Sequence, residues 1–209
     1  DFQYQGYRIE AGKPGLLGLP ATYVEKEQEA DTLVVELADT VTGLKAELYY
    51  TMFAEGSAVA RSVRYVNGGQ EAVYLERAMS LCLDLPDCDY DWVQLSGAWA
   101  RERHVIARRL AMGIQSVASL RGNSSHHHNP FLALKRPATT EQQGEAIGVS
   151  LVYSGNFLMQ AEVDAHNCTR VLAGIHPDTF CWKLEPGESF QTPEAVIAYS
   201  CQGLNGMSQ

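Results

Sequence analysis

Short β-rich segments separated by turn residues follow one another along the chain, and this succession restricts the fold more than any other feature. The segments are rich in β-branched and aromatic residues and alternate in part between apolar and polar positions. We predict strands at residues 2–10, 31–37, 44–53, 58–66, 73–81, 98–109, 113–119, 146–153, 157–164, 169–175, 179–184 and 194–200. Many short strands with even turn spacing predict an all-β fold, a sandwich or a barrel, with few or no helices.

Two local features refine this prediction. Asn67-Gly68-Gly69 supplies residues that tolerate positive φ, so we predict a hairpin between residues 58–66 and 73–81. The stretch "GAWARERHVIARRL" has helix-forming residues, but its strand-like neighbours and the flanking Gly97 and Gly113 favour a long strand. Residues 137–146, "PATTEQQGEA", are typical of a loop.

The bulk composition excludes several classes of protein. The 209 residues suffice for one β-sandwich domain over the whole chain, with 45% hydrophobic and 20% charged residues. The net charge of -9 argues against a nucleic-acid partner, which needs a basic face, but not against neutral carbohydrates. No apolar run reaches the roughly 18 residues that span a bilayer, so we predict no membrane partner.

The cysteines indicate a compartment. There are five, an odd number without a C-x-x-C pair, which is typical of reduced thiols in a cytoplasmic protein. No basic region precedes an apolar stretch at the start, so no signal peptide is predicted. The chain begins with Asp1 rather than Met, and its last stretch, "QGLNGMSQ", has no evident finish, so we expect a fragment of something longer.

Three consecutive histidines, His126 to His128, are the first candidate for chemistry. Neighbouring residues on a strand point to opposite faces, so the three cannot converge on one metal ion. His126 and His128 can share a side but need a further ligand, and the other histidines are scattered. We predict no metal site and interpret the segment as an ordered loop, after which Asn129-Pro130 restarts an extended segment. Such loops on a β scaffold often line an interface or a ligand site.

The acidic run "LDLPDCDYDW" is the second candidate. Asp87, Asp89 and Asp91 resemble the start of an EF-hand loop, but Trp92 and Ala98 stand where that loop needs Gly and Glu. A carboxylate pair for glycoside hydrolysis is the alternative, since alternate Asp residues on a strand approach the roughly 5–10 Å that it requires. Acidic decoration of a sheet edge is the more common explanation.

The third candidate is "SGAWARERHV". Trp99, Arg101 and Arg103 alternate, so on a continuous strand they share one face, with Glu102 and His104 opposite. An aromatic and guanidinium surface binds a sugar or a partner domain. A half-buried Trp beside solvated arginines explains the pattern equally well. No P-loop, G-x-S-x-G, H-E-x-x-H or G-x-G-x-x-G occurs, so no cofactor is predicted.

Five stretches carry a family resemblance: "LSGAWARERHV", "GIQSVASLRGNSSHHHNPF", "SLVYSGNF", "WKLEPGESFQTPEAV" and "YSCQGLNGMSQ". Together they make the chain, from about Tyr7 to Gln209, resemble the N-terminal domain of bacterial α-galactosidases of glycoside hydrolase family 36. The resemblance implies an antiparallel β-supersandwich of the galactose-mutarotase type, two large stacked sheets that precede a catalytic (β/α)8 barrel.

The resemblance also implies a division of labour. The family's enzymes are retaining, with an aspartate nucleophile in a Lys-Trp-Asp context and a second aspartate as acid/base, both in the barrel. Neither motif occurs here, since "CWKLE" is not that sequence. The chain is therefore expected to be inactive alone and to support hydrolysis of terminal α-galactosides, of the raffinose or melibiose type, by packing on the barrel and contributing to a homo-oligomer, commonly a tetramer.

In this frame Trp99, Arg101, His126 and Asn129 are candidates for an interface or a pocket rim, and the histidine loop is a structural element. The family usually varies the residue between the outer histidines, so we expect His127 to be replaceable. Part of the N-terminal domain is expected to precede residue 1, and its missing strands would leave a sheet edge exposed.

Two other functions stay open. A self-sufficient carbohydrate-binding module would bind galactosides through Trp92, Trp99 or Trp182. An enzyme of the aldose-1-epimerase type, suggested by fold analogy, would need a His acid and a Glu base that face one pocket.

Overall fold

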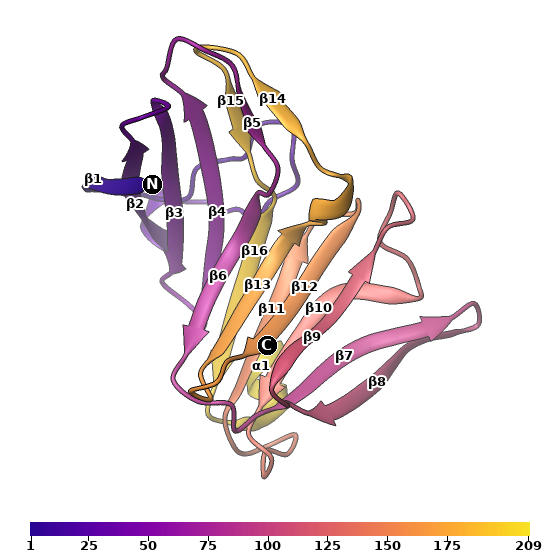
Figure 1. The fold of residues 1–209 in the computed structure, drawn as a ribbon. Helices are drawn as coiled ribbons and strands as arrows, with labels where there is room; N and C mark the ends of the chain where they lie inside the picture. The colour runs from indigo at the N-terminus through magenta and orange to yellow at the C-terminus, as the bar shows by residue number, and fades with distance from the viewer.

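The computed structural model describes residues 1–209 and confirms the all-β antiparallel prediction. A large sheet of ten strands forms one layer (Figure 1). Nine of its strands run in the order β1 (Phe2–Ala11), β2 (Ala30–Asp39), β3 (Leu44–Phe53), β4 (Ala58–Asn67), β16 (Glu194–Ser200), β11 (Ala146–Val152), β10 (His128–Lys135), β7 (Asp91–Ala98) and β8 (Arg101–Arg109). The tenth, β15 (Ser189–Gln191), pairs with β4.

A smaller sheet faces the middle of the large one. Its four strands run in the order β6 (Met79–Leu85), β13 (Thr169–Ile175), β12 (Phe157–Val163) and β9 (Gly113–Ser119). Two short strands, β5 (Val73–Leu75) and β14 (Trp182–Leu184), pair with each other at one end. Figure 1 shows β1 to β3 extending beyond β6 on one side of the small sheet, and the β7–β8 hairpin extending beyond β9 on the other.

The core lies between the two sheets. It contains 17 buried residues, drawn from alternate positions of strands in both layers. On β11 these are Ile147, Val149 and Leu151, and on β12 of the other sheet they include Phe157 and Met159. Each large apolar side chain that is fully buried stabilises the fold by about 1.5–3 kcal/mol.

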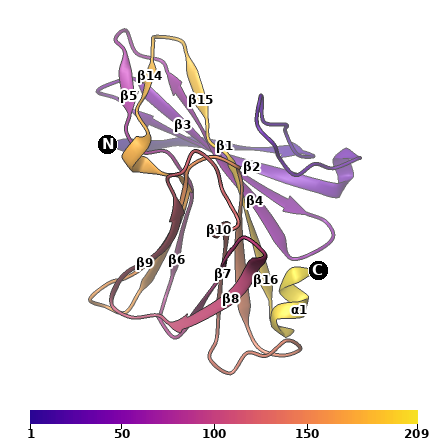
Figure 2. The same cartoon turned by 90° about the vertical axis from the view of Figure 1, so that its right-hand side faces the viewer.

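The back of the large sheet is covered differently. Residues 12–26, which connect β1 to the turn η1 (Glu27–Glu29), place Lys13 and Thr22 against the carboxylate of Glu194 on β16. The short helix α1 (Gly203–Ser208) packs on β11 and β16, where Gly148 leaves room for Met207. Figure 2 shows α1 on the side of the large sheet opposite to β9 and β6. No helix of the chain is long and apolar enough to cross a membrane.

The hairpin predicted between residues 58–66 and 73–81 is wrong. Strand β4 pairs with β3 along one edge and with β16 and β15 along the other, so neither edge is free for residues 73–81. The chain instead crosses to β5 and then to β6 in the facing sheet. Gly68 and Gly69 do not adopt positive φ. Gly69 is needed for close packing, since a Cβ there would lie 2.2 Å from the carbonyl oxygen of Thr42.

Candidate interface at the tip of the β7–β8 hairpin

The β7–β8 hairpin has an irregular tip. Trp99 and Ala100 form the connection, and Ala100 and Arg103 adopt the left-handed backbone conformation with φ of 62° and 57°. The register shifts here, so Ala98 pairs with Arg101 and Ser96 pairs with His104. Gly97 is required beside this bulge, because a Cβ on it would lie 2.2 Å from the carbonyl oxygen of Arg101.

Two direct contacts join the hairpin to the loop that contains the three histidines. The Gly97 N–H donates to the carbonyl oxygen of His127 at 3.1 Å. The Ser96 hydroxyl and Nδ1 of His128 share a hydrogen bond of 2.9 Å. The loop is held from its other side by the Gly122 N–H, which donates to Oδ1 of Asn156 at 2.6 Å. The histidine loop is thus ordered by contacts at both ends, as the sequence predicted.

A chain of polar side chains runs along β7 from the core to His128. Trp92 is fully buried, and its Nε1–H donates to Oε1 of Gln94 at 2.8 Å. Nε2 of Gln94 donates in turn to Oγ of Ser96 at 2.8 Å, which leaves the Ser96 hydroxyl hydrogen for Nδ1 of His128. These residues alternate on one face of the strand, so the core fixes the orientation of a surface imidazole through three hydrogen bonds.

The four candidate residues lie around this tip. Arg101 lines a shallow hollow with His104, His127 and His128, which we call the hairpin hollow. His126 and Asn129 line a second one with Glu102 and Arg103, which we call the loop hollow. Trp99 lies at the tip of the hairpin with 83% of its surface exposed. Oδ1 of Asn129 is buried and receives no hydrogen bond from a protein donor.

The predicted facing of this segment is wrong. The left-handed residues and the register shift place Arg101 and His104 in the same hollow, whereas Arg103 and Glu102 line the other. Trp99 belongs to the turn and to neither face of β8. Regular alternation, on which the prediction depended, fails at a bulge because one strand gains a residue.

The three histidines do not converge. His128 begins β10 and His127 lines the hairpin hollow, whereas His126 lines the loop hollow, with the rings of His126 and His127 4.3 Å apart. Nη1 of Arg121 donates to Nδ1 of His127 at 2.9 Å. Desolvation lowers the pKa of His127 below its usual value, and the positive charge of Arg121 acts in the same direction. No group of three or more His, Cys, Asp or Glu side chains in the chain has a metal-binding arrangement.

The acidic run is held in ion pairs. Arg136 donates to both carboxylate oxygens of Asp87 at 2.6 and 3.2 Å, which lowers the pKa of that carboxyl. Asp89 pairs with Arg109, and Asp91 pairs with Lys135 at 3.3 Å. Each carboxylate therefore has a cation of its own, which supports a structural role.

Tyr90, which lies between Asp89 and Asp91, also contacts Arg136. The guanidinium of Arg136 lies 4.0 Å from the ring centroid of Tyr90, and burial raises the pKa of Tyr90 to about 12 although the charge of Arg136 opposes the shift. Tyr90 belongs to the core cluster, so Arg136 links the acidic run to the interior of the sandwich.

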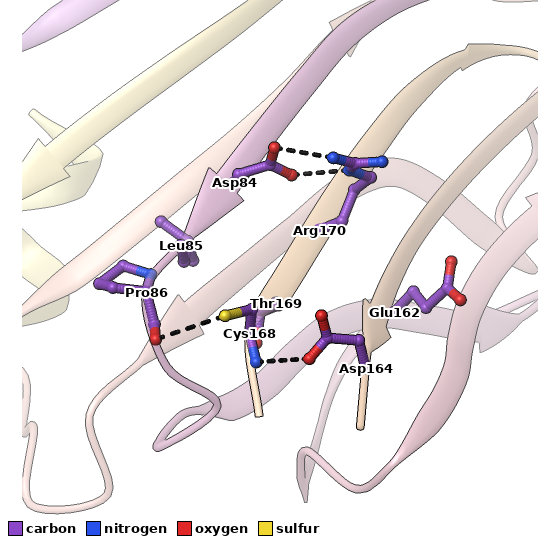
Figure 3. Close-up of a pocket in the computed structure, with 8 residues that line it drawn as sticks. All are labelled: Asp84, Leu85, Pro86, Glu162, Asp164, Cys168, Thr169 and Arg170. Atoms are coloured by element: carbon purple, nitrogen blue, oxygen red, sulfur yellow. Dashed lines mark hydrogen bonds and ion pairs between the residues drawn. The ribbon is translucent and has the colours of Figure 1, made fainter. Parts of the chain in front are cut away.

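A third hollow lies at the end of the small sheet (Figure 3). Two of its charges pair with each other, since Nε and Nη2 of Arg170 donate to the two oxygens of Asp84 at 2.7 and 2.9 Å, and Glu162 lines the hollow without an ion pair. Asp164 accepts from the Cys168 N–H at 2.9 Å and so closes its own turn. We interpret this hollow as a folded surface without a binding role.

The tryptophans differ in what they can contact. Trp92 is in the core, so it cannot serve as a sugar platform. Trp182 is half exposed and packs on Phe190 with ring centroids 5.3 Å apart. Trp99 is the tryptophan that presents its surface to a ligand or a partner. Gln94 and Ser96 were not among the predicted site residues, although their alternation with Trp92 along one strand is a signal that could have identified them.

Comparison with known proteins places the chain in a family. The family model described as the glycosyl hydrolase family 36 N-terminal domain matches residues 1–185, and the chain therefore belongs to this family. The chain is 54% identical over 209 residues to alpha-galactosidase AgaA of Geobacillus stearothermophilus, and 47% identical over 206 residues to alpha-galactosidase 1 of Pediococcus pentosaceus. These alignments cover 100% and 99% of this chain but 29% and 28% of the relatives.

The solved structures agree. The crystal structure of the AgaA enzyme superimposes on the whole chain with a TM-score of 0.98 at 53% identity, and the chain covers 29% of that structure. An alpha-galactosidase from Lactobacillus brevis gives a TM-score of 0.97 at 46% identity, with 28% of its chain covered. The chain thus spans less than a third of the length of these relatives, within an N-terminal domain family.

Proposed function

We propose that this chain is the non-catalytic N-terminal supersandwich of an α-galactosidase that hydrolyses terminal α-galactosides of the raffinose or melibiose type. The observation that carries the proposal is the match over the full chain, 54% identical, to a named alpha-galactosidase more than three times as long. Two variants of the relative AgaA were crystallised, one with raffinose and one with stachyose, both of which end in an α-galactoside.

The geometry favours a non-catalytic role for this domain. The carboxylates of the acidic run, which were the candidates for a catalytic pair, are each held by Arg or Lys. The features that a partner could use lie instead at the exposed tip of the β7–β8 hairpin. There an exposed Trp99, a guanidinium and the unpaired acceptor of Asn129 lie next to a loop that the core holds in place.

In this proposal the hairpin tip contacts either the catalytic barrel of the same chain or a neighbouring subunit of a homo-oligomer. Trp99, Arg101, His126 and Asn129 form that contact or the rim of the sugar pocket. The cytoplasm is the proposed location, because all five cysteines are free and four of them are exposed, which a reducing compartment preserves.

Hydrolysis of p-nitrophenyl α-galactoside tests the proposal, with the 209-residue chain and the longer natural polypeptide assayed side by side. We expect turnover by the longer polypeptide and none above buffer by the 209-residue chain. Turnover by the short chain would contradict the proposal. Because Glu102 and His126 share the loop hollow, interconversion of galactose anomers is measured on the same samples. Acceleration by the short chain would favour the epimerase-type alternative instead.

A further inference from the structure

An apolar face of the large sheet continues beyond the small sheet that covers its middle. The face is identified by register: Ile197 of β16 packs against the core, Val59 of β4 lies opposite Ile197, and Met52 of β3 lies opposite Val59. Val59 and Met52 therefore point to the same side as the core. Figure 1 shows no strand of the small sheet in front of β1, β2 or β3 on this side. We call the uncovered region the open face.

Large apolar side chains make up this open face. They line a broad groove, and six of them are Ile9, Leu33, Val35, Tyr50, Met52 and Val59. Ile9 is 67% exposed and Met52 is 64% exposed. On the back of the same strands, by contrast, Val34 is completely buried. Monomeric proteins rarely leave so much contiguous apolar surface in water, so the open face is expected to be an interaction surface.

A free strand edge borders the open face. In the small sheet β6 is a terminal strand that pairs with β13 alone, and it is the strand of that sheet that lies next to β4. A strand added to the free edge of β6 would hydrogen-bond to its backbone and would at the same time lie over β4 and β3. One extended segment would therefore pair an exposed edge and cover an apolar surface, which is the mode of recognition called strand addition.

A buried cation lies at the boundary between the open face and the core. Arg61 on β4 is 6% exposed, and its guanidinium lies 4.4 Å from the ring centroid of Tyr50, with which it is in register. Nη1 donates to the carbonyl oxygen of Ser62 at 2.7 Å, but Nε is buried without an acceptor. None of the ion pairs of the chain includes Arg61. A buried charge without a partner is costly, so a missing carboxylate is indicated at this point.

We propose that the open face binds an extended strand that adds to the edge of β6, has apolar side chains at alternate positions and carries a carboxylate for Arg61. The strand is supplied by the part of the longer polypeptide outside residues 1–209. The relatives contain ample chain for it, since the 209 residues cover 28–29% of their length. A second copy is a poorer fit, because two open faces packed together leave the β6 edge unpaired. This inference does not depend on the proposed enzymatic role.

Methionine oxidation gives the first test, because Met52 lies on the open face and Met112, which is 70% exposed, lies between β8 and β9. Each oxidation rate in dilute hydrogen peroxide is divided by the rate of the same residue in urea. In the 209-residue chain we expect both ratios to lie within about threefold of 1. In the longer natural polypeptide we expect Met52 to be oxidised at least tenfold more slowly than in urea. An unprotected Met52 in the longer polypeptide would overturn the proposal.

Photo-crosslinking identifies the segment on the face. p-Benzoylphenylalanine replaces Leu33 in the longer polypeptide, and a matched control replaces Val41, which is 88% exposed in the β2–β3 turn. We expect the probe at position 33 to give an intramolecular product, unchanged on tenfold dilution, with a segment outside residues 1–209 that contains Asp or Glu. Replacing that acid by its amide should raise the oxidation rate of Met52 at least threefold. A crosslink between two copies, or one confined to residues 1–209, would overturn the proposal.

Discussion

Nζ of Lys13 lies 2.6 Å from Oε2 of Glu194, and each of the two side chains is 3% exposed. The other carboxylate oxygen accepts from the backbone N–H and the hydroxyl of Thr22 at 2.8 and 2.6 Å. A single buried carboxylate therefore holds two points of the long β1–β2 connection against β16. The same connection contacts β2, where the buried Thr32 hydroxyl donates to the carbonyl oxygen of Gly12 at 2.8 Å, so it lies across the back of the large sheet from β2 to β16.

Replacing Glu194 by Gln should lower the free energy of unfolding by about 3–5 kcal/mol, because it leaves the buried ammonium of Lys13 without a counter-charge. Urea denaturation followed by tryptophan fluorescence measures the change. The matched control is Glu185→Gln, which removes an exposed carboxylate paired with Lys183 and should cost about 0–1 kcal/mol. Equal losses in the two variants would show that burial does not strengthen the Lys13–Glu194 pair.

Gly97 is the position where the hairpin tip tolerates no side chain. A Cβ there would lie 2.2 Å from the Arg101 carbonyl oxygen and 2.9 Å from Cα of Glu102, so the backbone must move. Gly97→Ala should lower the free energy of unfolding by about 1–3 kcal/mol and disturb the hydrogen bond to His127. Gly15→Ala is the control, since no atom lies within 4 Å of its Cβ and its φ is not positive. A stable Gly97→Ala variant with unchanged amide exchange at the tip would refute this prediction.

The strand positions could be predicted where turn residues bound an apolar segment. Strands β9, β13 and β16 have the predicted bounds, because a glycine, the turn residues Pro177-Asp178 or a neighbouring proline mark their ends. Strand β7 was missed, since its start lies inside the acidic run and Asp91 has low β propensity. Its stability comes from pairing with β8 and β10, which tertiary structure provides.

Local sequence could not determine which strands pair with each other in the sheets. Asn67 indicates a change of direction, and its amide does organise that turn by donating to the carbonyl oxygens of Glu71 and Leu184. Which strand comes to lie beside β4 depends on distant residues of β15 and β16. The same limit applies to the site. Trp99, Arg101, His126 and Asn129 were chosen from two separate stretches, and the β7–β10 pairing brings those stretches together.

The carboxyl group of Asp87 should titrate below its ordinary range, because two hydrogen bonds from Arg136 favour the charged form. A depressed pKa in the folded state means that this pair stabilises the fold above about pH 3.9 and loses its effect as the pH falls through the folded value. Carbon-13 NMR of the Asp87 carboxyl measures the pKa directly. Arg136→Met should raise it toward 3.9, whereas Arg170→Met should raise the pKa of Asp84 and leave that of Asp87 unchanged. A pKa of Asp87 that does not respond to Arg136→Met would contradict the assignment.

A mutation of Trp99 tests function without a change in stability, because 83% of the surface of Trp99 is exposed and its removal uncovers nothing in the core. Trp99→Ala should change the free energy of unfolding by no more than about 0.5 kcal/mol. In the longer polypeptide it should lower kcat/KM for an α-galactoside at least tenfold, or about 1.4 kcal/mol of transition-state stabilisation. Tyr23→Ala is the control, since Tyr23 is 79% exposed in the β1–β2 connection, far along the chain from the hairpin tip.

Light scattering on the same samples distinguishes the two roles proposed for the tip. If Trp99 packs on a neighbouring subunit, Trp99→Ala lowers the molar mass of the oligomer together with kcat/KM. If Trp99 forms the rim of the sugar pocket, the molar mass stays constant and the loss lies mainly in KM, because uniform binding of substrate and transition state is removed. An unchanged kcat/KM with an unchanged molar mass would show that the hairpin tip has neither role, and the interface would then have to be sought elsewhere on the domain.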